Sequence, residues 1–96
     1  MEGKMYVILV YDIRLDDTGP RIWRNVFKIC KKYLHHIQNS VFEGELTKAQ
    51  IMQLNVDLQK YIRRDRDSVI IFKSRNERWL EKEMWGTQED KTSNFL

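Results

Sequence analysis

A run of seven apolar residues, Met5 to Tyr11, places the strongest constraint on how this chain folds. The run is rich in β-branched and aromatic side chains and is too short for a helix that is apolar on every side, so it predicts a strand buried on both faces. It is also far shorter than the roughly 20 apolar residues of a membrane-spanning helix, so we expect no contact with a membrane. Because the chain has only 96 residues, we expect a single domain, residues 1–96.

The rest of the chain alternates between helical and extended patterns. A turn cluster that ends in Gly19 and Pro20 precedes an amphipathic helix, which Thr18 or the preceding aspartates are expected to cap. A strand-like segment, a second helix opened by a capping-box pattern, and a second wholly apolar strand follow. The four segments are residues 18–34, 37–46, 47–62 and 68–72.

This order predicts an α+β fold, a ferredoxin-like βαββαβ sandwich. Whether residues 37–46 form one long strand or a hairpin through Glu43 and Gly44 stays open. The two wholly apolar strands, residues 5–11 and 68–72, are expected at the centre of the sheet. The core then spans about residues 4–73, and residues 74–96, with two tryptophans, are expected to form an arm that covers a sheet edge of this chain or of a partner.

Positive charge is concentrated in one segment of the chain. The sequence has 17 Lys and Arg against 14 Asp and Glu, a formal net charge of +3. Residues 18–42 contain five bases and no acid, so the remainder of the chain is weakly acidic. The first helix therefore either presents a phosphate-binding face or is an ordinary solvated amphipathic helix. The five bases are Arg21, Arg24, Lys28, Lys31 and Lys32.

Several motifs of common enzyme chemistry are absent from the sequence. There is no phosphate-binding glycine loop, no G-x-S-x-G, no H-E-x-x-H and no C-x-x-C. The adjacent His35 and His36 diverge in a strand or a helix, so they form a poor metal site. The single cysteine, Cys30, lies on the apolar stripe of the first helix and is expected to fill the core. One cysteine fits a reducing compartment, so we expect a cytoplasmic location.

Asp12 is the best candidate for chemistry. It follows directly on the first apolar strand, and the carboxyl ends of central strands are where α/β-type sheets present functional groups. The alternative is that Asp12 begins a loop as a turn or cap residue. One carboxylate is too little for a catalytic magnesium site, but a twofold dimer could bring two copies of Asp12 to one divalent ion.

Two segments carry a resemblance to a known family. Tyr6–Ile13, with the sequence Y-V-I-L-V-Y-D-I, is followed by the basic helix and then by Ile37–Gly44, with the sequence I-Q-N-S-V-F-E-G. Together they resemble the small CRISPR-associated adaptation protein that is second in the Cas naming series, and the resemblance covers essentially the whole chain. It implies a prokaryotic, ferredoxin-like homodimer whose C-terminal strands cross to the partner.

The resemblance also implies a function for named residues. Asp12 would be the metal ligand and catalytic residue, paired with the partner's Asp12 and using Mg²⁺ or Mn²⁺ to cleave single-stranded RNA or double-stranded DNA. Tyr11, Ser40 and Phe42 would shape the dimer face near Asp12. The dimer would also act in spacer acquisition, where it binds spacer DNA and bridges two dimers of the CRISPR integrase in a heterohexamer.

Two alternatives to the nuclease remain. One is a non-catalytic adaptor in the integrase complex, with the five bases of the first helix on nucleic-acid phosphates; the other is a toxin-like ribonuclease of similar fold. Binding through the basic helix should weaken steeply with salt. Three further arginines lie in a charged segment before the last apolar strand; they are Arg63, Arg64 and Arg66. We interpret them as turn residues, and the alternatives are a part in the nucleic-acid face or in contacts with the integrase.

Overall fold

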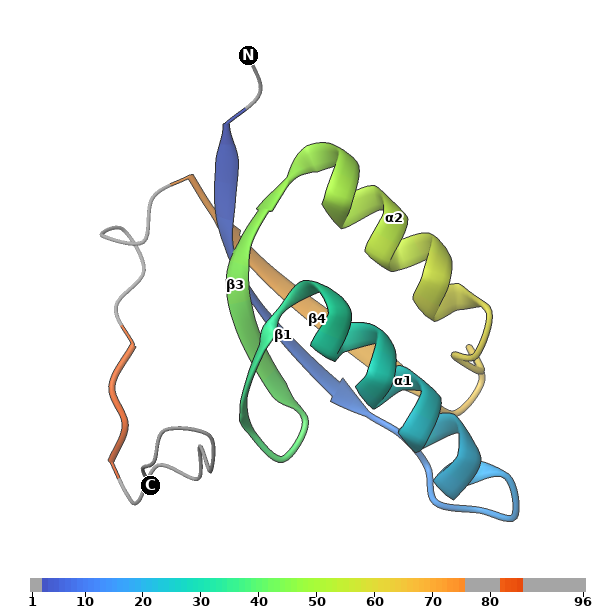
Figure 1. Cartoon of the computed structure of the whole chain (residues 1–96). Helices are drawn as coiled ribbons and strands as arrows, with labels where there is room; N and C mark the ends of the chain where they lie inside the picture. Colours follow the sequence, from blue (N-terminus) through green and yellow to red (C-terminus); the bar gives the residue numbers. More distant parts are fainter. Residues whose placement is uncertain (1–2, 76–81, 86–96) are drawn as a thin grey trace.

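A computed structural model describes residues 3–75 and 82–85 of the chain. Four strands and two helices follow one another in the order βαββαβ (Figure 1). The strands are β1 (Lys4–Asp12), β2 (His35–Gln38), β3 (Val41–Thr47) and β4 (Ser68–Ser74). The helices are α1 (Gly19–Tyr33) and α2 (Lys48–Gln59). The predicted α+β, ferredoxin-like architecture is confirmed.

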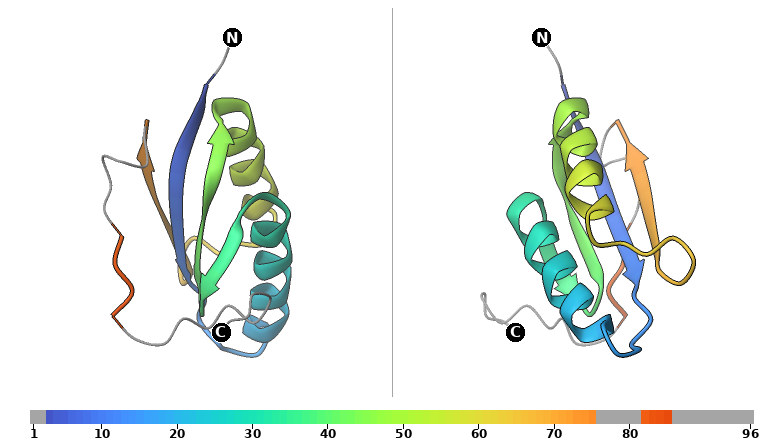
Figure 2. Two further views of the ribbon diagram at one scale, coloured as in Figure 1. Left: turned by 60° about the vertical axis from the view of Figure 1, so that its left-hand side comes forward. Right: turned by 90° about the vertical axis from the view of Figure 1, so that its right-hand side faces the viewer.

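The molecule has two layers. The strands form one sheet in the order β2-β3-β1-β4, and every neighbouring pair is antiparallel. Both helices cover the same face of this sheet, as the two views of Figure 2 show. Within the described residues, no helix covers the opposite face. None of the described helices is long and apolar enough to cross a membrane.

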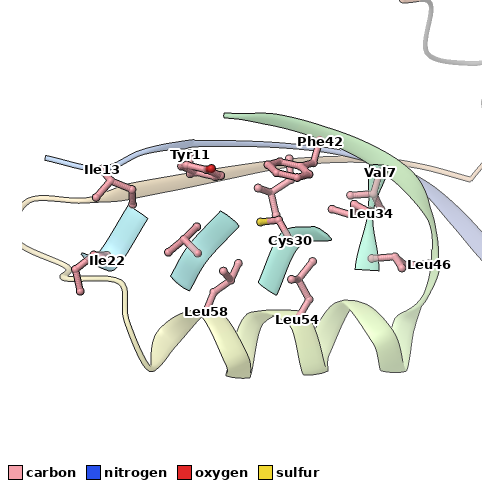
Figure 3. Close-up of a cluster of buried hydrophobic side chains, with 12 residues drawn as sticks. Val7, Tyr11, Ile13, Ile22, Cys30, Leu34, Phe42, Leu46, Leu54 and Leu58 are labelled. Carbon is pink, nitrogen blue, oxygen red and sulfur yellow. The ribbon is translucent and has the colours of Figure 1, made fainter. Parts of the chain in front are cut away.

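The core lies between the sheet and the helices (Figure 3). Side chains alternate along a strand, so every second residue of β1 points towards the helices. On this face Val7, Leu9 and Tyr11 are buried. The predicted apolar stripe of α1, formed by every third or fourth residue, packs against this face of the sheet. Its buried members are Ile22, Val26 and Cys30.

Residues 35–47 form a hairpin, and its turn is not where Gly44 suggested. The chain turns at Asn39 and Ser40, and Asn39 adopts a positive φ of 42°, which asparagine tolerates better than most residues. Gly44 lies inside β3, where an added Cβ would be only 3.0 Å from Cδ2 of Leu34. The glycine therefore allows the end of α1 to pack closely on β3.

The prediction that residues 68–72 form a central strand is wrong. Among the described strands, β4 lies at an edge of the sheet, and β3 is the central neighbour of β1. Ile70 and Phe72 are each 52% exposed. Both project from the face that the helices do not cover, because Leu9 and Ile71, on the helix side, are paired partners. Burial within the described chain therefore does not explain why β4 is apolar on both sides.

The two helices begin differently. At α2 the capping box is confirmed: the backbone N–H of Gln50 donates to Oγ1 of Thr47 over 3.1 Å, and the N–H of Thr47 donates to Oε1 of Gln50 over 2.8 Å. At α1 the expected side-chain cap is absent, since Thr18 makes no capping hydrogen bond. Its hydroxyl instead accepts a hydrogen bond from Arg63 over 2.8 Å.

Most of the predicted arm, residues 74–96, lies outside the described residues. Of its described part, Lys82 contacts β3, where its Nζ lies 2.6 Å from Oε2 of Glu43. Glu43 also accepts a 2.5 Å hydrogen bond from the hydroxyl of Tyr6. These two hydrogen bonds hold the pKa of Glu43 below its ordinary value even though burial of the carboxyl opposes them. Crossing of the arm to a partner stays a prediction.

Candidate functional site

Asp12 is the last residue of β1, and its side chain is exposed. It is paired in register with Ser68, the first residue of β4. Because side chains alternate along β1, Asp12 lies on the same side of the sheet as Ile8 and Val10, away from both helices. The fold therefore presents this carboxylate at the end of a strand, on the face that no described helix covers.

That face of the sheet is largely apolar around its centre. Five apolar side chains from three adjacent strands lie on it, and the two on β4 are half exposed. We call this surface, together with Asp12 at its end, the open face. Its apolar members are Ile8, Val10, Val41, Ile70 and Phe72. An exposed apolar patch on a small protein is typical of a contact surface.

The described part of one chain does not assemble a complete metal centre. Within residues 3–75 and 82–85, no three His, Cys, Asp or Glu side chains lie close enough together to hold a metal ion. Asp12 by itself fits a hard divalent ion, because Mg²⁺ binds through one or two carboxylates and keeps several water ligands. Further ligands of such an ion would be water or groups from a partner.

The three residues predicted to shape a dimer face lie in different places. Tyr11 and Phe42 are 2% and 0% exposed, and their stacked rings lie on the helix side of the sheet with centroids 6.0 Å apart (Figure 3). Neither side chain is therefore on the open face, so neither could contact a partner there directly; their part in shaping a dimer face stays a prediction. Ser40 lies at the end of the sheet near Asp12, where its carbonyl accepts a 3.2 Å hydrogen bond from the N–H of Tyr11.

The five basic residues form one stripe along α1, and all five are exposed. Because an α-helix turns about 100° per residue, they fall within about 100° of its circumference, opposite the buried stripe. Lys28 and Lys32 border a groove between α1 and α2, which Asp57 and Lys60 also line. The basic stripe faces away from the sheet on the helix side, whereas Asp12 lies on the open face.

The remaining sequence candidates have structural roles. Cys30 is fully buried, and its burial raises the thiol pKa to about 12, so the thiol stays protonated and unreactive. This confirms the prediction of a core residue. The ring of His36 packs against the rings of Phe27 and Phe42, each with centroids 4.9 Å apart, while His35 is exposed. The two histidines therefore do not act as a metal-binding pair.

A cluster of ion pairs beside the end of β1 was not predicted as such. Arg63 lies between α2 and β4, and all five N–H groups of its guanidinium donate hydrogen bonds. Two of them reach Asp67, at 2.9 and 3.0 Å. The other three reach the loop between β1 and α1, at the Arg14 carbonyl (2.8 Å), Oδ1 of Asp16 (2.7 Å) and Oγ1 of Thr18 (2.8 Å).

Asp67 completes this cluster from the other side. Its side chain is fully buried, and Oδ1 accepts a 3.0 Å hydrogen bond from the N–H of Arg14. Burial alone would raise the pKa of Asp67, but the hydrogen bonds from Arg63 and Arg14 hold it below its ordinary value. Arg66 adds an outer contact to Asp16 at 3.2 Å. Arg63, Arg64 and Arg66 thus lie in the segment between α2 and β4, and Arg64 is exposed; whether any of them contacts nucleic acid or integrase stays open.

By its fold, the chain is a small ferredoxin-like protein. It has an apolar open face and an exposed carboxylate at the end of a central strand. The sequence model of one family, described as "CRISPR associated protein Cas2", matches residues 5–82. The chain therefore belongs to the Cas2 family, which confirms the resemblance found in the sequence.

Individual relatives agree with this membership. The chain is 69% identical over 93 residues to the CRISPR-associated endoribonuclease Cas2 of Fusobacterium nucleatum subsp. nucleatum, covering 97% of this chain and 88% of the relative. It is 36% identical over 92 residues to the protein of the same name from Methanosarcina acetivorans, covering 96% and 100%. A solved structure described as "Crystal structure of cas2" superimposes with a TM-score of 0.78 at 34% identity, covering 98% of this chain and 100% of that one.

Proposed function

We propose that this protein is a homodimeric, metal-dependent endoribonuclease of CRISPR adaptation, with Asp12 as its metal ligand and catalytic residue. The observation that carries the proposal is the position of Asp12, exposed at the end of a central strand and on the open face. Relatives named as endoribonucleases support RNA as a substrate, and double-stranded DNA is a second one to test.

The open face supports the dimer. Ile70 and Phe72 remain half exposed within the described chain, and a second copy would bury them. In a twofold contact the same surface of each chain faces its copy. If the axis passes near the end of β1, the two copies of Asp12 come close together. The dimer would thus supply a second carboxylate to the ion, where the described part of one chain has no group of three His, Cys, Asp or Glu side chains that could hold it.

The chemistry follows from two facing carboxylates. A bound Mg²⁺ or Mn²⁺ would supply charge to polarise a phosphodiester and lower the pKa of a water ligand. Asp12 of each chain would hold the ion, and the firmly paired end of β1 would fix the position of the carboxylate. Ser68, opposite Asp12 in the register, is a small residue with a hydroxyl group.

The test is cleavage of a labelled single-stranded RNA across a magnesium titration, with labelled double-stranded DNA assayed in parallel. Asp12→Asn keeps the shape of the side chain and removes its charge, so we expect cleavage to fall by about 100-fold or more while the dimer persists. Asp17→Asn is the matched control, because it removes the same charge from an exposed residue of the following loop. Cleavage by Asp12→Asn at the rate of the control would refute the role of Asp12.

A second function, as a nucleic-acid-binding adaptor, is favoured by the basic stripe of α1. In a dimer, this stripe would lie on the outer side of each chain, away from Asp12, and could bind spacer DNA while the dimer bridges two integrase dimers. Phosphate contacts release counterions, so the affinity for double-stranded DNA should fall linearly with salt on a log–log scale. Lys31→Gln with Lys32→Gln should lower that slope by about two. If the slope for this variant equals that of wild type, the basic stripe does not contact the DNA phosphates.

A further inference from the structure

Arg63 holds the chain immediately after Asp12. Its guanidinium binds the β1–α1 loop at three acceptors, the Arg14 carbonyl, Oδ1 of Asp16 and Oγ1 of Thr18, at 2.7 to 2.8 Å. These contacts span 45 to 49 residues of sequence. No hydrogen bond joins Arg63 to Asp12 among the contacts of the described residues, so any influence of Arg63 on that carboxylate passes through the loop.

Asp67, just before β4, and Ser68, its first residue, hold the same part of the chain. The carboxylate of Asp67 accepts a hydrogen bond from the N–H of Arg14, two residues after Asp12. The next residue, Ser68, is paired with Asp12 itself. Both backbone hydrogen-bonding groups of Arg14 are thus occupied by this one cluster, the N–H by Asp67 and the carbonyl by Arg63.

A turn at the surface does not require a buried charge, yet this cluster contains one. The side chain of Asp67 is fully buried, and burial of a charge has a large desolvation cost unless the charge is paired and hydrogen-bonded. Surface loops are ordinarily the most mobile part of a fold, and a reacting group must be held within about half an ångström of its working position. A buried arginine–aspartate pair is one way to hold the loop that follows Asp12.

We propose that Arg63 is a positioning residue for Asp12, which acts by fixing the backbone at Arg14 through the buried pair with Asp67. The inference rests on the proposed function of Asp12 and deepens it. Lysine would not replace Arg63, since its three N–H donors leave from a single atom and cannot reproduce a planar fork that serves Asp67 and the loop together.

The test compares Arg63→Lys and Arg63→Ala with Arg64→Ala as the control. Like Arg63→Ala, the control removes one positive charge, but from the exposed neighbour. In both Arg63 variants, we expect amide hydrogen exchange in residues 13–18 to accelerate by about tenfold or more, while exchange in α2 stays as in wild type. We expect kcat for single-stranded RNA to fall by about 10- to 100-fold with KM unchanged, because a displacement of about 1 Å has that effect on rate.

Chemical rescue separates positioning from general loss of structure. Free guanidinium, well below denaturing concentrations, should restore part of kcat to Arg63→Ala, whereas potassium at equal ionic strength should not. A milder variant, Asp16→Asn with Thr18→Val, removes the charge of one loop acceptor and the hydroxyl of another, and keeps the pair of Arg63 with Asp67. It should lower kcat in the same direction, by about threefold to tenfold, without lowering the unfolding midpoint as far as Arg63→Ala.

The outcomes distinguish this inference from the proposed function. If both Arg63 variants match Arg64→Ala in loop exchange and in kcat, Arg63 is not a positioning residue. If loop exchange accelerates but kcat does not change, Arg63 holds the loop but does not position Asp12, and the inference is wrong. If wild type itself cleaves no RNA or DNA at any magnesium concentration, the proposed function fails, and loop exchange alone decides whether Arg63 fixes the backbone after Asp12.

Discussion

At the scale of single residues, the hydroxyl of Tyr11 is a buried donor without an acceptor in the described part of the chain. Burial raises the pKa of this hydroxyl well above its ordinary value, so it stays protonated. Tyr11→Phe removes the unpaired group without opening a large cavity. We expect the free energy of unfolding to rise by about 1 kcal/mol, measured by urea denaturation at one chain concentration.

Tyr33→Phe is the matched control for this prediction. The hydroxyl of Tyr33 donates a 2.7 Å hydrogen bond to Oδ2 of Asp57, so the same change should lower the free energy of unfolding. If Tyr11→Phe destabilises the protein as much as Tyr33→Phe does, the hydroxyl of Tyr11 has a partner after all.

The carboxyl of Asp16 predicts a pH dependence of stability. The hydrogen bond from Arg63 is the largest cause that lowers the pKa of Asp16 from 3.8 to about 2. Because the pKa is lower in the folded state, the stabilisation is complete above about pH 4 and is lost as the pH falls towards 2. The difference in unfolding free energy between wild type and Asp16→Asn should shrink over this range. A difference that stays constant with pH would contradict the contact with Arg63.

At the scale of elements, the loop between β1 and α1 depends on Gly19. A Cβ at this position would lie 2.3 Å from the carbonyl oxygen of Arg14, which also accepts the hydrogen bond from Arg63. Gly19→Ala must therefore move the loop, and we expect it to lower the free energy of unfolding by about 1 to 3 kcal/mol. Gly3→Ala is the control, since nothing lies within 4 Å of its added Cβ. Equal stability of the two variants would show that the loop yields at little cost.

Elements with a strong local pattern could be predicted from the sequence. The apolar stripe of α1, the capping box of α2 and the central strand β1 depend on residues close in sequence, and all three were predicted correctly. Burial of β1 on both faces was not, since Ile8 and Val10 on the open face are only partly buried. The turn of the hairpin could not be placed from the sequence, because Gly44 is a turn signal although it serves the packing of Leu34. Likewise, apolarity on both sides of β4 indicated a central strand, but it does not distinguish burial by the chain from burial by a partner.

The candidate site could be predicted from the sequence only in part. Asp12 was identified because its position follows from one strand and its end. The cluster of Arg63 and Asp67 was not, because the sequence records a charged turn but not that this turn lies beside the loop after β1. Tyr11 and Phe42 were assigned to a dimer face from the family resemblance, and strand alternation, which places them on the helix side, was not applied to them. Contacts between distant segments are thus where sequence patterns fail.

At the scale of the whole molecule, the two faces of the sheet have different surfaces. The helix side carries the basic stripe, and the open face carries Asp12 and five apolar side chains. If the open face is the dimer contact, Phe72→Glu should bury two charges there and shift the mass in sedimentation equilibrium from dimer towards monomer. Met52→Glu on α2 is the control, since Met52 is 69% exposed on the helix side. A dimer that survives Phe72→Glu would place the contact elsewhere.

The central claim is that two copies of Asp12 form one site, and the most direct measurement uses mixed dimers. Wild-type and Asp12→Asn chains are co-expressed, their ratio in the purified protein is quantified by mass spectrometry, and magnesium-dependent RNA cleavage is measured at constant total protein. If both carboxylates are required, activity falls with the square of the wild-type fraction, to about a quarter at equal amounts, because only dimers of two wild-type chains cleave. A fall in simple proportion, to about half, would mean that each Asp12 acts alone and would contradict the shared site.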